Sequence, residues 1–240
     1  MEYLFIIAVG LVAGTLSGVV GFGSSLMLMP VLVIAFGPLQ AVPIMAIAAV
    51  MANLSRVLVW WREIDWPSCA AFAATAAPFG ALGAYTLLSL PTRLIETALG
   101  VFFIAMIGIR RWMAAHDLRL RPLHLALIGA PIGYLTGIVV STGPITAPLF
   151  LAAGLAKGRF IGTEAAATLA VFVAKALVFR GFGALPLEIA VKGLITGSTL
   201  MAGAFIAKRF VLQMDAARFR LLMDALMLVS GLVLLLFAAL

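Results

Sequence analysis

Long apolar stretches dominate the chain, and polar positions gather in short segments between them. No charged residue occurs from Tyr3 to Leu39 or from Pro122 to Ala156. About 20 apolar residues suffice for a helix to cross a bilayer. The pattern predicts ten apolar segments, at 3–20, 24–37, 41–61, 67–89, 93–109, 123–140, 144–156, 162–179, 186–207 and 219–239.

Composition identifies the surroundings of these segments as lipid. Hydrophobic residues make up 65% of the 240 and charged residues 10%, with a mean hydropathy of +1.22. Soluble domains carry about 25% charged residues. The apolar runs are continuous, which excludes the short alternating segments of a barrel. Helices satisfy their own backbone hydrogen bonds in lipid. We therefore expect an all-α integral membrane protein.

Glycines spaced four apart occur twice in this apolar sequence. Gly10, Gly14 and Gly18 are each followed 119 residues later by another glycine, at Gly129, Gly133 and Gly137. Such a stripe of small residues lets a second helix approach closely. The same offset relates Pro67 to Pro186 and Arg56 to Lys175. The sequence predicts two repeats of about 119 residues, a plan common among transporters.

The repeats cover 1–112 and 123–240, with a basic linker at 113–122, and together form one integrated transport domain. If 3–37 is one broken span, each repeat crosses four times and the two are parallel. If the turn near Gly21 separates two spans, each crosses five times and the repeats are inverted. The segments 24–37 and 144–156 are only about 20 Å long as helices, so the preceding turns are expected inside the bilayer.

Basic residues favour ten crossings over eight, because they concentrate in short cytoplasmic loops. With eight crossings, the basic residues of the loops divide six against seven. With ten, Arg93 and Arg180 stand alone on one side. The cytoplasmic side then holds the eleven others, namely Arg62, Arg110, Arg111, Arg119, Arg121, Lys157, Arg159, Lys208, Arg209, Arg218 and Arg220. We expect five plus five crossings, with both termini outside.

Two helix-breaking motifs stand at matching places in the repeats. "GFGSS" contains Gly23, Ser24 and Ser25, and "STGPIT" contains Ser141, Thr142 and Gly143. Paired interruptions of this kind point to the binding site of a transporter. The helix that starts after each break directs free N–H groups at the cavity, which suits an anion. The alternative is a pair of kinks whose hydroxyls serve helix packing.

The motifs "AGTLSGVVGFGSSLMLMP", "TGIVVSTGPITAPLFL" and "GRFIGTEAAATLAVFVAKALVF" resemble the TauE/SafE sulfite exporter family of anion permeases. The resemblance runs along essentially the whole chain. It implies movement of small sulfur-containing anions, such as sulfite or sulfoacetate, across the bacterial inner membrane. The family more often shows a third glycine where this chain has Ser24, which adds a hydroxyl.

Arg56 and Lys175 lead the candidates for holding such an anion. Each is the only basic residue well inside its span, where charges are costly and usually functional. Arg56 offers a planar fork of donors and Lys175 a compact charge. The alternative is that both extend to the headgroups.

Further polar residues join these candidates. Asn53 precedes Arg56 by three residues, on the same helical face, and can orient the guanidinium, contact substrate or support packing. Glu164 is either a dipole partner in a first helical turn or a proton carrier. Glu188 and Lys192, and likewise Arg220 and Asp224, have the spacing of helical ion pairs.

Other classes of function find little support. Two histidines and a single cysteine, Cys69, offer no metal site, disulfide or redox motif, and nucleotide-binding loops are absent. We attribute the net charge of +7 to basic residues in cytoplasmic loops, where they set the topology and contact anionic lipids, and not to nucleic-acid binding. No cofactor is expected, and a homodimer is left open. We expect a secondary transporter, not an enzyme; the alternatives are an anion channel or a scaffold subunit.

Overall fold

The computed structural model describes residues 2–20, 24–116, 119–139 and 142–210, together with Leu228, Leu232 and Leu236. Every regular element in these ranges is helical. The elements are α1 (Glu2–Val20), α2 (Ser24–Phe36), α3 (Pro38–Trp60), the short 3₁₀ helix η1 (Trp61–Glu63), α4 (Trp66–Leu88), α5 (Thr92–Ala115), α6 (Pro122–Ile138), α7 (Gly143–Ala152), α8 (Lys157–Gly181) and α9 (Leu187–Phe210). Nine of the ten expected segments are thus helices. The tenth, 219–239, lies outside the described residues except for the three leucines.

Three of the described helical stretches are long and apolar enough to cross a membrane by length and composition. They are Leu39–Glu63, Trp66–Leu88 and Gly158–Gly181. Shorter apolar helices cover Ile6–Thr15, Met27–Phe36, Pro122–Ile138 and Gly143–Ala152. The prediction of an all-helical membrane protein is confirmed at this level.

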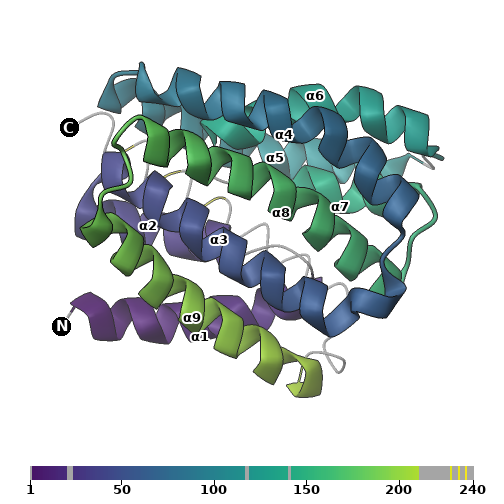
Figure 1. Cartoon of the computed structure of the whole chain (residues 1–240), viewed down its shortest axis with the longest axis horizontal. Helices are drawn as coiled ribbons and strands as arrows, with labels where there is room; N and C mark the ends of the chain where they lie inside the picture. The colour runs from purple at the N-terminus through teal and green to yellow at the C-terminus, as the bar shows by residue number, and fades with distance from the viewer. Residues whose placement is uncertain are drawn as a thin grey trace.

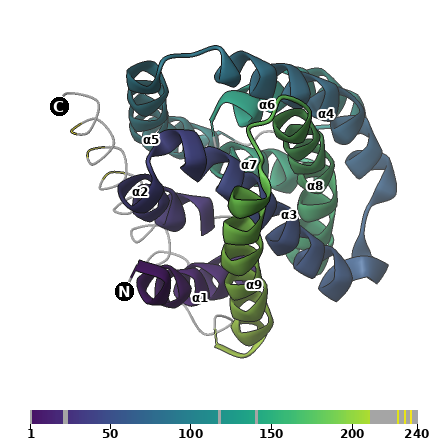
Figure 2. The same cartoon turned by 60° about the vertical axis from the view of Figure 1, so that its left-hand side comes forward.

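The helices form a layered bundle with α3 and α8 at its centre (Figure 1). On one side of this pair α4 packs along α6, and on the other α1 packs along α9. A view turned by 60° shows the same three layers, with α2 and α5 flanking them (Figure 2). The centre of the molecule is therefore built from the two helices that carry Arg56 and Lys175.

Glycines set the spacing of the outer helix pairs, as their periodicity predicts. A Cβ added at Gly14 would lie 2.4 Å from the carbonyl oxygen of Leu200 in α9. A Cβ added at Gly133 would lie 2.1 Å from the carbonyl oxygen of Ala76 in α4. No real side chain tolerates such distances, so only glycine permits these backbone contacts. The surroundings of Gly18 lie outside what the structure describes.

Residue pairs between helices give the chain directions within the bundle. Asn53, Arg56 and Trp60 of α3 meet residues 168, 164 and 162 of α8, respectively, so these two helices are antiparallel. Along α4 and α6, by contrast, Thr75 meets Gly129 and Gly83 meets Gly137, so that pair is parallel.

The helices α6 and α7 form a hairpin. The N–H of Leu120, just before α6, donates to the carbonyl of Ala152, at the end of α7, over 2.9 Å. The chain therefore enters along α6, turns after Val139 and returns beside its entry point. Val140 and Ser141 lie outside the described residues.

Polar and aromatic contacts tie the connecting segments together at each end of the bundle. Asp65 accepts a hydrogen bond from the N–H of Ser68, which caps α4. The pKa of this carboxyl group is lowered, first by the side chain of Ser68 and further by this N–H and by Arg159. The same carboxylate pairs with Arg159 at 2.8 Å and so links the α3–α4 connection to the start of α8.

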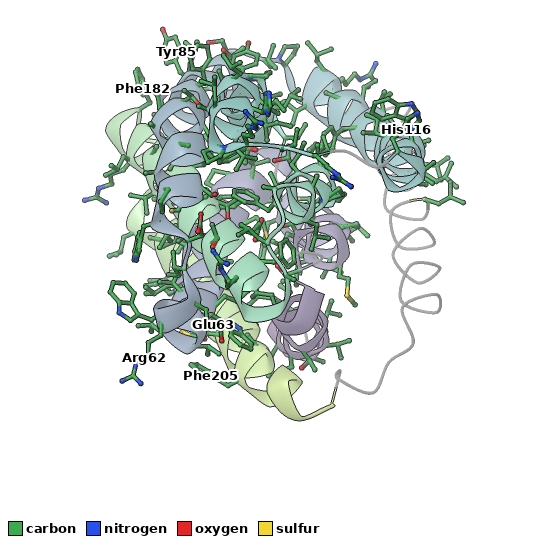
Figure 3. The ribbon with its side chains drawn as sticks, turned by 90° about the vertical axis from the view of Figure 1, so that its right-hand side faces the viewer. Arg62, Glu63, Tyr85, His116, Phe182 and Phe205 are labelled. Atoms are coloured by element: carbon green, nitrogen blue, oxygen red, sulfur yellow. The ribbon has the colours of Figure 1, made fainter. Side chains whose placement is uncertain are left out.

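At the opposite end, the rings of Tyr85 and Phe182 lie 5.1 Å apart (Figure 3). Lys192 donates to Gln40 over 3.2 Å. It also pairs with Glu188 at 2.7 Å, which confirms the predicted helical ion pair. The second predicted pair, Arg220 and Asp224, lies outside the described residues.

Candidate polar site between α3, α7 and α8

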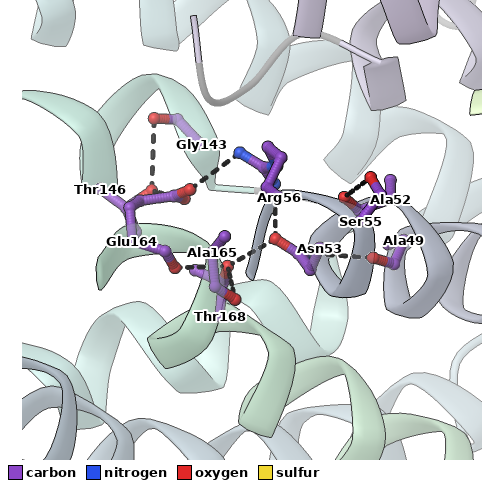
Figure 4. Close-up of polar contacts among 10 residues, drawn as sticks. All are labelled: Ala49, Ala52, Asn53, Ser55, Arg56, Gly143, Thr146, Glu164, Ala165 and Thr168. Carbon is purple, nitrogen blue, oxygen red and sulfur yellow. Dashed lines mark hydrogen bonds and ion pairs between the residues drawn. The ribbon is translucent and has the colours of Figure 1, made fainter. Parts of the chain in front are cut away.

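A chain of buried polar side chains crosses the centre of the bundle (Figure 4). Arg56 of α3 donates from Nη1 to Oε2 of Glu164 in α8 over 3.1 Å. Its Nη2 donates to Oδ1 of Asn53. The other carboxylate oxygen of Glu164 accepts from the hydroxyl of Thr146 in α7, also over 3.1 Å. Thr168 completes the chain by donating to Oδ1 of Asn53 over 3.0 Å.

Burial overturns the alternative in which Arg56 and Lys175 extend to the lipid headgroups. The side chain of Arg56 is 7% exposed and that of its partner Glu164 is 3% exposed. Lys175 is 1% exposed. Each charge is instead retained inside the protein, because polar groups of neighbouring helices surround it.

Glu164 does not occupy the first turn of its helix, which corrects one expectation. The span was predicted to begin near residue 162, but α8 begins at Lys157. Two further turns precede Glu164, because the short polar stretch after residue 156 continues the helix. The carboxylate therefore faces Arg56 and not the N-terminus of its own helix.

The guanidinium of Arg56 keeps one donor without a partner. Its Nε is fully buried and has no hydrogen-bond partner among the residues that the structure describes. An unsatisfied buried donor costs about 1–3 kcal/mol, and more where the group is charged. Arginine binds oxyanions best through two parallel N–H donors, and here Nε is the donor left over for such a contact.

Lys175 is held by a different set of groups. Its Nζ donates to the carbonyls of Thr136 and Val139, over 2.9 and 3.0 Å, at the end of α6. It also lies 5.6 Å from the centre of the Phe179 ring. A positive charge at a helix C-terminus interacts favourably with the dipole and the free carbonyls. Lys175 thus caps α6 where the hairpin turns.

The start of α7 lies between the two basic residues. Thr142, which precedes the first turn, pairs with the hydroxyl of Thr136, whose carbonyl binds Lys175. Thr146, within the first turn, binds Glu164 and through it Arg56. The structure therefore brings Arg56, Lys175, Asn53, Glu164, Thr142 and Gly143 to the region around one helix N-terminus.

The structure describes both serines of the first break. Ser24 and Ser25 begin α2 and are buried. Gly23 and Ser141, the remaining predicted site residues, lie outside the described residues. No direct contact joins Arg56 to Lys175 in the part of the chain that the structure describes; their link runs through α7.

Three threonines of this site were not selected from the sequence. One of them could have been found from its spacing. Thr168 follows Glu164 by four residues and Lys175 follows it by eleven, so Glu164, Thr168 and Lys175 share one helical face. Thr136 and Thr146 offered no such pattern, because their partners lie on other helices.

A surface hollow of about 660 Å³ lies elsewhere, lined by residues 58–63 at the end of α3 and in η1. Its lining includes none of the buried charges. No cluster of side chains suited to a metal ion occurs among the described residues. The buried polar chain thus remains the better candidate for a binding site.

A family model described as "Sulfite exporter TauE/SafE" matches residues 6–234. The chain belongs to the TauE/SafE sulfite exporter family. No curated protein and no solved structure gives a significant match. Membership of the TauE/SafE family identifies a membrane protein whose relatives are transporters. The polar side chains described above are the interior groups of this TauE/SafE protein.

Proposed function

We propose that the chain is a secondary transporter of small sulfur-containing anions, sulfite or organosulfonates such as sulfoacetate, working by alternating access. The observation that carries the proposal is the start of α7, placed between the groups that hold Arg56 and Lys175. The positive end of a helix dipole favours anions, and a buried guanidinium with an unused Nε supplies a directional donor.

The paired packing of the helices supports an internal repeat. A Cβ at Gly10 would meet the hydroxyl of Thr199, and a Cβ at Gly129 would meet that of Thr75. The contacts of Gly14 with Leu200 and of Gly133 with Ala76 correspond in the same way. The glycines differ by 119 positions and their partners by 124. The repeat therefore includes a shift of five residues between α4 and α9.

The chain directions support five crossings in each repeat. In that arrangement α3 and α8 are equivalent helices of inverted repeats and run antiparallel, as observed. Four crossings in each repeat would make them parallel. The α6–α7 hairpin also favours two passes over one broken span.

We place the protein in the bacterial inner membrane as a multi-pass protein, in contact with anionic lipids. Four arginines gather at the end of the bundle that we assign to the cytoplasm, namely Arg62, Arg119, Arg121 and Arg159. This follows the positive-inside rule.

Transport can be measured with purified protein in liposomes. We expect saturable uptake of labelled sulfite and sulfoacetate, with exchange against unlabelled anion inside. Transport of chloride and sulfate should be slower. In a channel, by contrast, unlabelled anion inside the liposomes would not accelerate the uptake of labelled anion. The absence of flux for every anion would refute the proposal.

A further inference from the structure

We propose that Glu164 is an internal competitor of the transported anion for Arg56, and that the anion binds as Glu164 takes up a proton. The inference rests on the proposed function and adds its coupling ion. It starts from the direct contact of 3.1 Å between Nη1 of Arg56 and Oε2 of Glu164.

The carboxylate occupies Arg56 in the way that a bound oxyanion would. It takes one donor, Nη1, while Asn53 takes Nη2 and Nε stays unused. The Nε–H points to the same side of the guanidinium as Nη2, so a sulfonate or sulfite group can approach Nε and the adjacent N–H of Nη2 together, which is the lateral two-donor contact of arginine. The incoming anion therefore gains a donor that Glu164 leaves unsatisfied.

Two anions cannot share this guanidinium at low cost. Both sites are buried, and like charges repel strongly where water is excluded. Once Glu164 is protonated it becomes neutral, and its contact with Arg56 weakens. The proton comes from water on the open side of the carrier and is held on the carboxyl group.

The charges near Glu164 leave Arg56 as its close partner. Among the helices packed against α8, α3 supplies Arg56, while α4 and α7 carry no Asp, Glu, Lys, Arg or His. On α8 itself, Arg159 lies five residues before Glu164 and pairs with Asp65. Lys175 lies about three turns away and is bound to the carbonyls of α6. The remaining ionisable groups that the described parts of α4, α6 and η1 contribute are Cys69, Tyr85 and Tyr134 and the exposed His124, Arg62 and Glu63.

Linkage turns this competition into coupling. If the anion binds only to the form with protonated Glu164, each bound anion brings one proton with it. Above the pH at which Glu164 loses its proton, the affinity should fall by up to about tenfold per pH unit. The anion and the proton then move across the membrane in the same direction.

Calorimetry on the purified full chain tests this inference. The probe is methanesulfonate, which does not change charge near neutral pH. We expect uptake of about one proton per anion bound, from titrations in buffers of different ionisation enthalpy, and tighter binding at lower pH. Glu164→Gln should bind with an affinity that no longer depends on pH.

The matched control is Glu188→Gln, which makes the same change at an exposed carboxylate and should keep the wild-type pH dependence. Should Glu164→Gln fail to fold, Thr146→Val carries the test. It removes a hydrogen bond to the ionised carboxylate, so anion binding should extend to higher pH.

Wild-type binding without proton uptake, or an unshifted pH dependence in Thr146→Val, would overturn the inference. Absence of methanesulfonate and sulfite binding at every pH would instead overturn the proposed function, and this inference with it.

Discussion

Single buried charges are the costliest residues in this protein. Arg56 is offset by Glu164 and Asn53, whereas Lys175 has only carbonyl oxygens and an aromatic ring within reach in the described part of the chain. A buried ion pair contributes little net stability, because desolvation offsets most of the attraction. Lipid-embedded proteins that retain such charges generally use them.

The side chain of Arg56 can be tested by two substitutions. Arg56→Gln removes a charge-assisted contact worth about 1.5–3 kcal/mol, so anion affinity should fall about 10- to 150-fold. Arg56→Lys keeps the charge but lacks the planar fork and should lose part of that affinity. Equilibrium binding of methanesulfonate gives the values. The exposed Arg62→Gln is the control, and wild-type affinity in a folded Arg56→Gln protein would refute the site.

At the scale of elements, the glycine contacts decide how closely the helices approach. Gly133 faces the backbone of Ala76, and Gly14 faces that of Leu200. Helices in lipid gain little from the hydrophobic effect between themselves and depend on close packing. The short distance between α4 and α6 therefore contributes directly to their association.

The glycine contacts can be tested by adding one methyl group. Gly133→Ala should lower the free energy of unfolding by about 1–3 kcal/mol or more, because the new Cβ meets backbone that cannot rotate away. Gly108→Ala, in α5, has nothing within 4 Å of its added Cβ. There alanine should be neutral or stabilising, by up to about 1 kcal/mol. Thermal unfolding in detergent measures both, and equal melting temperatures would contradict the packing argument.

At the scale of the whole molecule, the chain directions and the residues at the two ends of the bundle both fit a path that alternates between two faces. Residues 61–65, 120 and 152–159 meet at one end, and residues 36–40, 85 and 182–192 lie at the other. An alternating path of five passes in each repeat places these groups on opposite faces of a membrane. The basic residues then lie mainly on one face.

Labelling of introduced cysteines tests this arrangement, in a chain whose buried Cys69 is replaced by serine. With ten crossings, Glu63→Cys and His116→Cys should react from the cytoplasm, and Ser89→Cys and Phe182→Cys from outside. All four positions are exposed. Position 182 decides between the arrangements, because eight crossings would group it with 116. Cytoplasmic labelling at 182 would therefore restore the eight-crossing arrangement.

The hydrophobic pattern by itself determined the helices. The apolar segments 24–37 and 144–156 correspond to α2 (Ser24–Phe36) and α7 (Gly143–Ala152), because Gly37 and Gly154, both with positive φ, follow these helices and favour their ends through local backbone chemistry. Pro30 and Pro148 lie within the two helices. The glycine stripes predicted close contacts for the same reason, since the absence of a side chain is a local property. The start of α8 was predicted too late, because residues 157–161, which include Lys157 and Arg159, also form helix.

Only the tertiary structure decided which polar groups meet. The equivalence of Arg56 and Lys175 suggested one shared environment, yet Arg56 pairs with Glu164 and Lys175 caps α6. Those partners lie 108 and 36–39 residues away along the chain, beyond the reach of helical periodicity. Burial, the hairpin of α6 and α7, and the unused Nε of Arg56 all depend on how the helices pack, since packing determines which donors remain without acceptors.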